Sequence, residues 1–194
     1  FQAGYNNTGG TSITAIGYNA LYGNTTGYQN TAVGYSSQSN NTTGVLNTSM
    51  GFYSMFSNTT GNQNVAIGPY ALWQANSNNN IAIGLNALTQ GGGNGQNVAI
   101  GVEAGTNAQD AQNIFIGHQA GKFSTTISSS VAIGTYALLN NVTGTALTAI
   151  GRGSLQNNTA GGNTAMGYLS AYNNTSGSGI TAIGNSGSYS NTRS

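Results

Sequence analysis

The chain has 194 residues, of which 37% are hydrophobic and 3% are charged. Three basic and two acidic residues leave a net charge of +1, which excludes the basic surface that binds nucleic acid or anionic membranes. There is no cysteine, so disulfides and thiolate metal sites are excluded. No apolar run is as long as a membrane span, and the start at Phe1, without a signal-like segment, suggests a fragment of a longer fibrous protein.

A four-residue pattern, first seen as Thr14-Ala15-Ile16-Gly17, returns along the whole chain at steps of 16 or 17 residues. A fixed period of this length indicates a repeat protein, and the steady Gly, Asn and Thr content argues against helices. We therefore predict an all-β fold, a parallel β-roll (β-solenoid) of about eleven coils, as a single repeat domain over residues 1–194. The corner glycines that end the pattern are Gly17, Gly34, Gly51, Gly68, Gly84, Gly101, Gly117, Gly134, Gly151, Gly167 and Gly184.

The residue one position before each glycine is Ile, Val or Met. The residue three positions before it is Thr, Val or Ile. Residues two apart on a strand share a face, so we expect both positions to point inward and the residue between them, usually Ala, to point outward. The outward Ala row would then be a flat strip suited to packing against another sheet. The predicted core row is Ile16, Val33, Met50, Ile67, Ile83, Ile100, Ile116, Ile133, Ile150, Met166 and Ile183.

Each glycine is predicted to form a tight corner, because glycine adopts positive φ at little steric cost. A second apolar pair, such as Ala20-Leu21, follows the corner and indicates a second short strand or a bend. The coil then returns through a turn of the form Asn24-Thr25-Thr26-Gly27. Seven coils also carry Asn four residues before the glycine, as at Asn30, where it either stacks amide on amide between coils or only forms a turn.

The motif Asn30-Thr31-Ala32-Val33-Gly34-Tyr35, and its copy from Asn163 to Tyr168, resembles the head repeats of YadA-like trimeric autotransporter adhesins and the repeats of phage-type tail fibres. The resemblance implies a left-handed parallel β-roll in which three chains pack around a common axis. It also implies an extracellular, cell-surface or virion tail-fibre protein. The adhesin heads have a shorter period, and this chain contains no neck or coiled-coil stalk.

Aromatic residues follow several corner glycines directly. They either close an interface between chains or form an exposed platform on which sugars stack, and we regard them as candidate surface-binding residues. This set is Tyr18, Tyr35, Phe52 and Tyr168.

Residues 84–130 form divergent coils in which the Asn-Thr-Thr-Gly turn is lost and Glu103, Asp110, His118 and Lys122 appear. A functional interpretation is a recognition patch, whereas the simpler one is drift of a degenerate repeat with a few solvated charges. Two carboxylates and one histidine at unrelated coil positions do not form a catalytic set, and no metal or cofactor site is predicted.

Asn-x-Thr and Asn-x-Ser sequons recur because the turn itself contains them, so turn chemistry explains them without attached sugar. Glycosylation is therefore the lesser of two interpretations. Its candidate sites are Asn24, Asn41, Asn58 and Asn141.

Regular repetition and scarcity of charge favour a structural and adhesive fibre shaft without catalytic activity, assembled as a homotrimer. A self-assembling extracellular filament is an alternative, as is a glycan- or ice-binding solenoid. The expected partners are the chain itself and a host or cell-surface glycan or receptor, with no nucleic acid and no membrane insertion.

Overall fold

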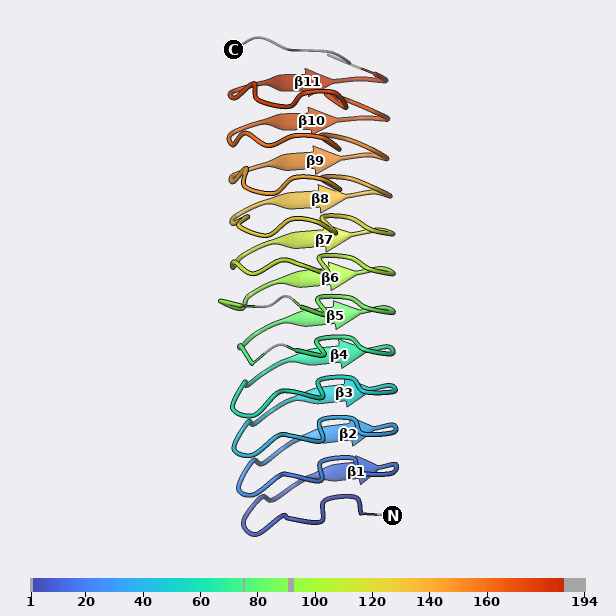
Figure 1. Ribbon diagram of the computed structural model, residues 1–194, viewed down its shortest axis with the longest axis vertical. Helices are drawn as coiled ribbons and strands as arrows, with labels where there is room; N and C mark the ends of the chain where they lie inside the picture. Colours follow the sequence, from blue (N-terminus) through green and yellow to red (C-terminus); the bar gives the residue numbers. More distant parts are fainter. Residues whose placement is uncertain (1, 75, 91–92, 187–194) are drawn as a thin grey trace.

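The computed structural model describes residues 2–74, 76–90 and 93–186 as a single stack of coils with one strand in each coil (Figure 1). Part of the divergent bend, Gly91 and Gly92, lies outside the described residues. The described part of the chain contains no helix, and therefore none that could cross a membrane. The strands are β1 (Thr14–Ile16), β2 (Thr31–Val33), β3 (Thr48–Met50), β4 (Val65–Ile67), β5 (Ile81–Ile83), β6 (Val98–Ile100), β7 (Ile114–Ile116), β8 (Val131–Ile133), β9 (Thr148–Ile150), β10 (Thr164–Met166) and β11 (Thr181–Ile183).

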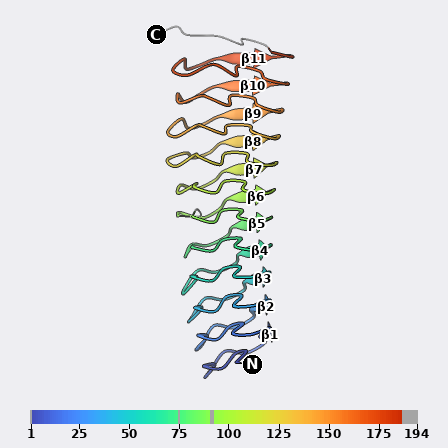
Figure 2. The same ribbon diagram turned by 45° about the vertical axis from the view of Figure 1, so that its right-hand side comes forward.

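The strands form one parallel eleven-stranded sheet in sequence order, which confirms the predicted all-β solenoid. Each strand pairs with the next in register, so that Thr14 lies opposite Thr31 and Ala15 opposite Ala32. The register also holds across a 16-residue step, where Val65 pairs with Ile81. The sheet lies along one side of the stack and the return segments lie along the other (Figure 2).

The corner glycines have the conformation that the repeat predicts, with φ between +124° and +142°. At Gly68 an added Cβ would lie 2.7 Å from the carbonyl oxygen of Gly84 in the next coil. Successive corners thus stack too closely for any side chain, which is a second reason for glycine besides its backbone angle.

The segment after each corner is a bend rather than a second strand. Its residues alternate in and out of the left-handed region, and Leu21 (φ 49°) and Leu138 (φ 52°) adopt it despite their side chains. The bend is held from coil to coil by backbone hydrogen bonds, such as the Leu21 amide donating to the Ser37 carbonyl at 3.0 Å. Coil-to-coil bonding therefore continues outside the three-residue strands.

The predicted inside and outside of the strand are reversed. The middle residues, such as Ala32 and Ala66, are fully buried, whereas Ile16 is 59% exposed. Alternation along a strand determines which residues share a face, but not which face is inside. Six members of the predicted core row are exposed, namely Ile16, Met50, Ile67, Ile100, Met166 and Ile183. The other five are half-buried, namely Val33, Ile83, Ile116, Ile133 and Ile150.

The real core is thin and consists of small residues from the strand and from the following bend. The inner Ala of each strand packs near a second Ala or Ser and a Leu, as with Ala82, Ala87 and Leu88. The coil is too narrow for two large side chains to face each other. That width explains why the small residue of the strand, and not Ile, points inward.

Amide stacks line the rest of the interior, and the asparagines four residues before the glycines stack from coil to coil, as do the asparagines of the turns. The side chain of Asn80 donates to Asn64 Oδ1 at 3.1 Å, and its own Oδ1 accepts from the backbone of Asn97 at 3.1 Å. In the turns, Asn41 donates to Asn24 Oδ1 at 2.7 Å and also to the carbonyl of Gly44 at 3.0 Å. Both stacks satisfy most of their buried amide groups by bonding to the next coil, and Asn58 Oδ1 is an exception without a partner.

Candidate functional site

The outward face of the sheet is made of two parallel rows, the first and the last residue of every strand, which we call the outer rows. They frame the buried Ala row and belong to β1 through β11. In the middle coils both rows are apolar, as with Val98 and Ile100, whereas the outer coils carry Thr in the first row, as with Thr14. The chain thus presents a flat, uncharged face with a dry centre and more polar ends.

The candidate surface-binding aromatics lie at the edge of this face. The rings of Tyr18 and Tyr35 stack at 5.2 Å between centroids, and Phe52 continues the stack at 5.5 Å. All three are exposed, so both interpretations, a covered interface and a sugar platform, stay open. Tyr168 lies far along the stack from these three and instead accepts a hydrogen bond of 3.1 Å from Arg152.

A second group of aromatic residues lies beside the first and was not singled out from the sequence. Tyr53 and Tyr70 are parallel at 6.0 Å, and Phe56 and Trp73 contact them edge-on. These residues stand two and five positions after the corner glycine, and that recurrence was the signal that could have found them. Repulsion from Tyr53 raises the pKa of Tyr35 above its ordinary value.

The four candidate glycosylation sites are not accessible in the folded chain. The side chains of these asparagines are fully buried, and each donates a hydrogen bond across its own turn, as Asn24 does to the Gly27 carbonyl at 2.9 Å. A sugar on such an amide would replace that bond and has no space. The residues are Asn24, Asn41, Asn58 and Asn141.

The charged residues of the divergent coils do not form one site. Lys122 pairs with Glu103 at 2.8 Å, and Gln119 donates to the same carboxylate oxygen at 2.6 Å. These bonds hold the pKa of Glu103 below its ordinary value. Asp110 lies apart, where Asn94 donates to it at 3.4 Å. Within the described ranges no three His, Asp or Glu residues come close enough to hold a metal ion.

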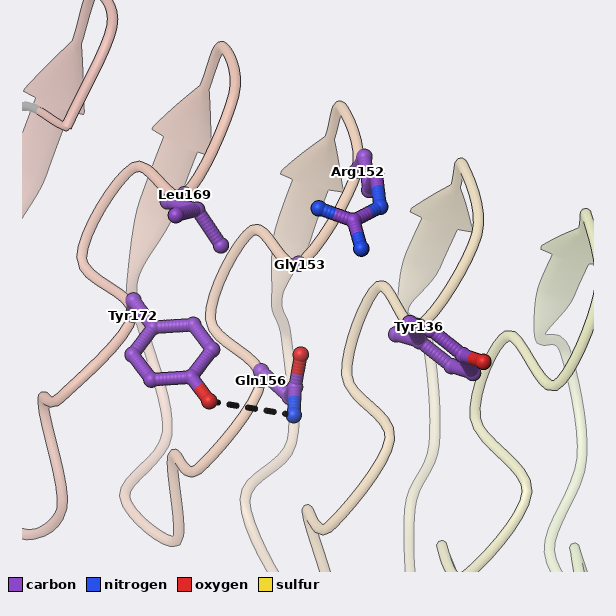
Figure 3. Close-up of a pocket in the computed structure, with 6 residues that line it drawn as sticks. All are labelled: Tyr136, Arg152, Gly153, Gln156, Leu169 and Tyr172. Carbon is purple, nitrogen blue, oxygen red and sulfur yellow. Dashed lines mark hydrogen bonds between the residues drawn. The ribbon is translucent and has the colours of Figure 1, made fainter.

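A hollow of about 320 Å³ lies on the bends that follow three successive corners, those after β8, β9 and β10 (Figure 3). Comparison of the repeats explains it. The residue two positions after the corner glycine is a side-chain-bearing residue in every coil except one, where it is Gly153. The neighbours in that row, Tyr136 and Leu169, therefore face each other across a missing side chain. The remaining lining residues are Arg152, Gln156 and Tyr172.

The hollow combines one cation with aromatic rings. The guanidinium of Arg152 lies 6.0 Å from the Tyr136 ring centroid and 5.6 Å from that of Tyr168. Among the described residues no carboxylate pairs with Arg152, because the one ion pair found there joins Lys122 and Glu103. Gln156 donates from Nε2 to the hydroxyl of Tyr172 at 3.5 Å (Figure 3).

Comparison of the chain with protein-family models, curated proteins and solved structures found no match. The fold itself defines the class of protein. It is a parallel β-solenoid repeat protein with one strand in each coil.

Proposed function

We propose that this chain is the shaft of an extracellular fibre, of the surface-adhesin or tail-fibre type, in which three chains pack through their outer rows. It acts as a structural and adhesive element and not as an enzyme. The observation that carries the proposal is an outward apolar row along the whole sheet, from Ile16 to Ile183, which a second apolar row joins in the middle coils, from Val65 to Val131. Contiguous apolar surface on a soluble protein marks an interaction site.

The size of the face supports an interface. Eleven strands spaced about 4.8 Å apart extend about 50 Å, and the two rows lie about 7 Å apart on each strand. The resulting strip of roughly 350 Å² is within the range of functional patches, and the stacked aromatics at its edge enlarge it. No outer-row residue is charged, so no carboxylate or ammonium group needs to be desolvated when a second chain covers the strip.

The thin interior gives a second reason for assembly. Each coil buries little more than two small residues and one Leu, so the stabilisation from burial within one chain is modest. Covering the Ile, Val and Met side chains of the outer rows would add the larger apolar groups to the buried set. The number three, the left-handed coil and the location on a cell surface or a virion follow from the resemblance to YadA-like heads.

The mass of the native chain by sedimentation equilibrium tests the proposal. We expect a mass close to three times 19.6 kDa. The double variant Ile83→Glu/Ile100→Glu places two carboxylates at the centre of the outer rows and should reduce the mass to that of one chain. Thr126→Glu/Thr143→Glu, which carries the same charges on exposed bends, should leave the trimer intact. A wild-type monomer contradicts the proposal, and very large open-ended species favour the filament.

A second candidate, ice binding, is favoured by the position of threonine. Thr14, Thr31 and Thr48 point outward in register, as do Thr148, Thr164 and Thr181. Regularly spaced outward hydroxyls on a flat sheet are a geometry on which water can order. This candidate predicts thermal hysteresis in the wild type. The hysteresis should persist in the Thr126→Glu/Thr143→Glu control and disappear in a Thr14→Lys/Thr31→Lys variant. Absence of hysteresis in the wild type would dismiss the candidate.

A further inference from the structure

We propose that the hollow between Tyr136 and Leu169 is a subsite for one sugar ring that carries a carboxylate, such as a uronic or a sialic acid. This inference deepens the proposed adhesive fibre by naming its ligand class. It depends on the chemistry of three neighbouring coils and not on how many chains assemble. The hollow lies on the bends that follow the corners, and no outer-row residue lines it (Figure 3).

The charge of the site selects an anion. Arg152 is exposed and uses one donor on Tyr168, out of the five that a guanidinium offers. The nearest described carboxylate along the corner row, Glu103, belongs to a coil three steps away, about 14 Å along the stack, where salt screens it. A planar guanidinium without a carboxylate partner matches a ligand carboxylate bidentately.

The aromatic rings hold that cation and supply an apolar wall. Contacts of 6.0 Å and 5.6 Å to Tyr136 and Tyr168 place the guanidinium at the rim of the hollow instead of leaving it free in solvent. Tyr136 is half-buried and lines the hollow. Ring faces pack against the C–H face of a pyranose, whereas a linear acid offers no such surface.

The depth of the hollow is created by Gly153. A Cβ built on Gly153 would lie 2.6 Å from Leu169 Cδ2 and 3.2 Å from Gln156 Oε1, so the end of Leu169 already reaches into the space that a side chain at this position would take. Gln156 turns its nitrogen toward Tyr172 and its oxygen toward Gly153 (Figure 3). That oxygen is placed to accept a hydrogen bond from a sugar hydroxyl. A few polar groups among aromatic and aliphatic walls, in about 320 Å³, is a typical composition for a small ligand site.

The test is calorimetric titration of the native protein with matched acidic and neutral probes. Sialyllactose is compared with lactose, and tri-galacturonate with a neutral trisaccharide, so that the two acid sources are separated. We expect binding of at least one acidic probe, weaker at high salt, with the neutral partner at least tenfold weaker. The proposal is overturned if acidic and neutral sugars bind equally, or if neither acid binds. It is also overturned if inorganic phosphate or hexaglutamate binds as tightly as the acidic sugar.

Variants locate the site. Arg152→Gln should reduce affinity for the acidic probe about tenfold or more without changing the weak affinity for the neutral one. Gly153→Ser fills the hollow and should abolish binding while the fold persists. Its close contacts are the ends of two flexible side chains, Leu169 Cδ2 and Gln156 Oε1, and Ser36 adopts a positive φ of 51° at the equivalent position. Lys122→Gln removes another cation of the stack and should leave binding unchanged. Full binding by Arg152→Gln would contradict the assignment.

The same preparations separate this inference from the fibre proposal. A protein with the mass of three chains that binds no acidic sugar overturns the subsite alone. A monomer that binds the acidic sugar and loses it in Arg152→Gln overturns the trimer and supports the subsite.

Discussion

At the scale of single residues, the coil tolerates left-handed backbone with ordinary side chains but requires glycine where coils approach. Gln63, Gln96 and Gln112, each five residues before a corner glycine, have φ of 58° to 65°. The corner itself has φ near +130° and touches the next corner. Positions with φ near +60° therefore accept residues with side chains, whereas the corner positions accept only glycine.

The first prediction concerns this difference. Gly68→Ala should lower the free energy of unfolding by about 3 kcal/mol or more, because its Cβ meets the Gly84 backbone at a strained angle of +124°. Gly162→Gln is the matched control, since it restores a residue type that other coils carry there and its Cβ would lie 4.0 Å from the nearest atom, the backbone nitrogen of Gly179. Urea denaturation of both variants measures the effect. Equal destabilisation of the two would show that crowding between corners is not the cause.

A pH-dependent prediction follows from Glu103. Its pKa is lowered by hydrogen bonds from Lys122 and Gln119, so the contribution of these bonds to stability is present above the unfolded pKa, about 4.3, and is lost as pH falls through the folded value. Because the pair is about a quarter exposed, the contribution is at most about 1 kcal/mol. Glu103→Gln should therefore be less stable than the wild type at pH 7 and equally stable near pH 2. A difference that does not depend on pH would contradict this account.

At the scale of elements, β7 shows how two coils compensate for one oversized residue. Phe115 occupies the inner position that holds Ala in most strands, and it is fully buried. The bends on either side carry Gly105 and Gly121 where five other coils have Leu, and a Cβ on Gly105 would lie 2.7 Å from the Phe115 ring. The divergence of these coils is therefore partly coordinated repacking and not only drift.

Coupling between these positions is the third prediction. Phe115→Ala should cost about 3–5 kcal/mol because it leaves a cavity between the two glycines. Gly121→Leu should be destabilising in the presence of Phe115 and should recover part of the loss in the double variant. The double variant recreates the Ala and Leu pairing of other coils, where Leu138 already adopts φ 52°. A double-mutant cycle in denaturant measures the coupling, and additive effects would refute it.

At the scale of the whole molecule, the stack is a one-dimensional array in which each strand pairs only with the strands before and after it. The 16-residue steps leave strand register intact. The corners repeat more regularly along the stack than the return turns on the opposite side (Figure 1). Changes in coil length are therefore absorbed in the return turns, away from the sheet. Stability of such an array is approximately a sum over coils and their contacts.

Removal of one coil tests this additivity. Deletion of residues 131–147, one 17-residue step, joins Ser130 to Thr148 and should leave ten strands in register, with a rod shorter by about 4.8 Å. Small-angle scattering and circular dichroism measure length and strand content. Deletion of residues 131–139 removes half a coil. It should disrupt the strand register and abolish cooperative unfolding. Equal tolerance of both deletions would contradict a register-locked stack.

The sequence alone determined the period, the solenoid class and the corner glycines, because these depend on local spacing and on a backbone angle that few residues adopt. It also indicated stacked asparagines, since a period brings identical residues to one height. Tertiary structure decided which strand face is inside. Ala and Ile alternate along the strand equally well in either orientation. Only the width of the closed coil favours Ala on the inner face and Ile on the outer face. The hollow at Gly153 likewise required three coils in place, because a missing side chain becomes a cavity only between neighbours that keep theirs.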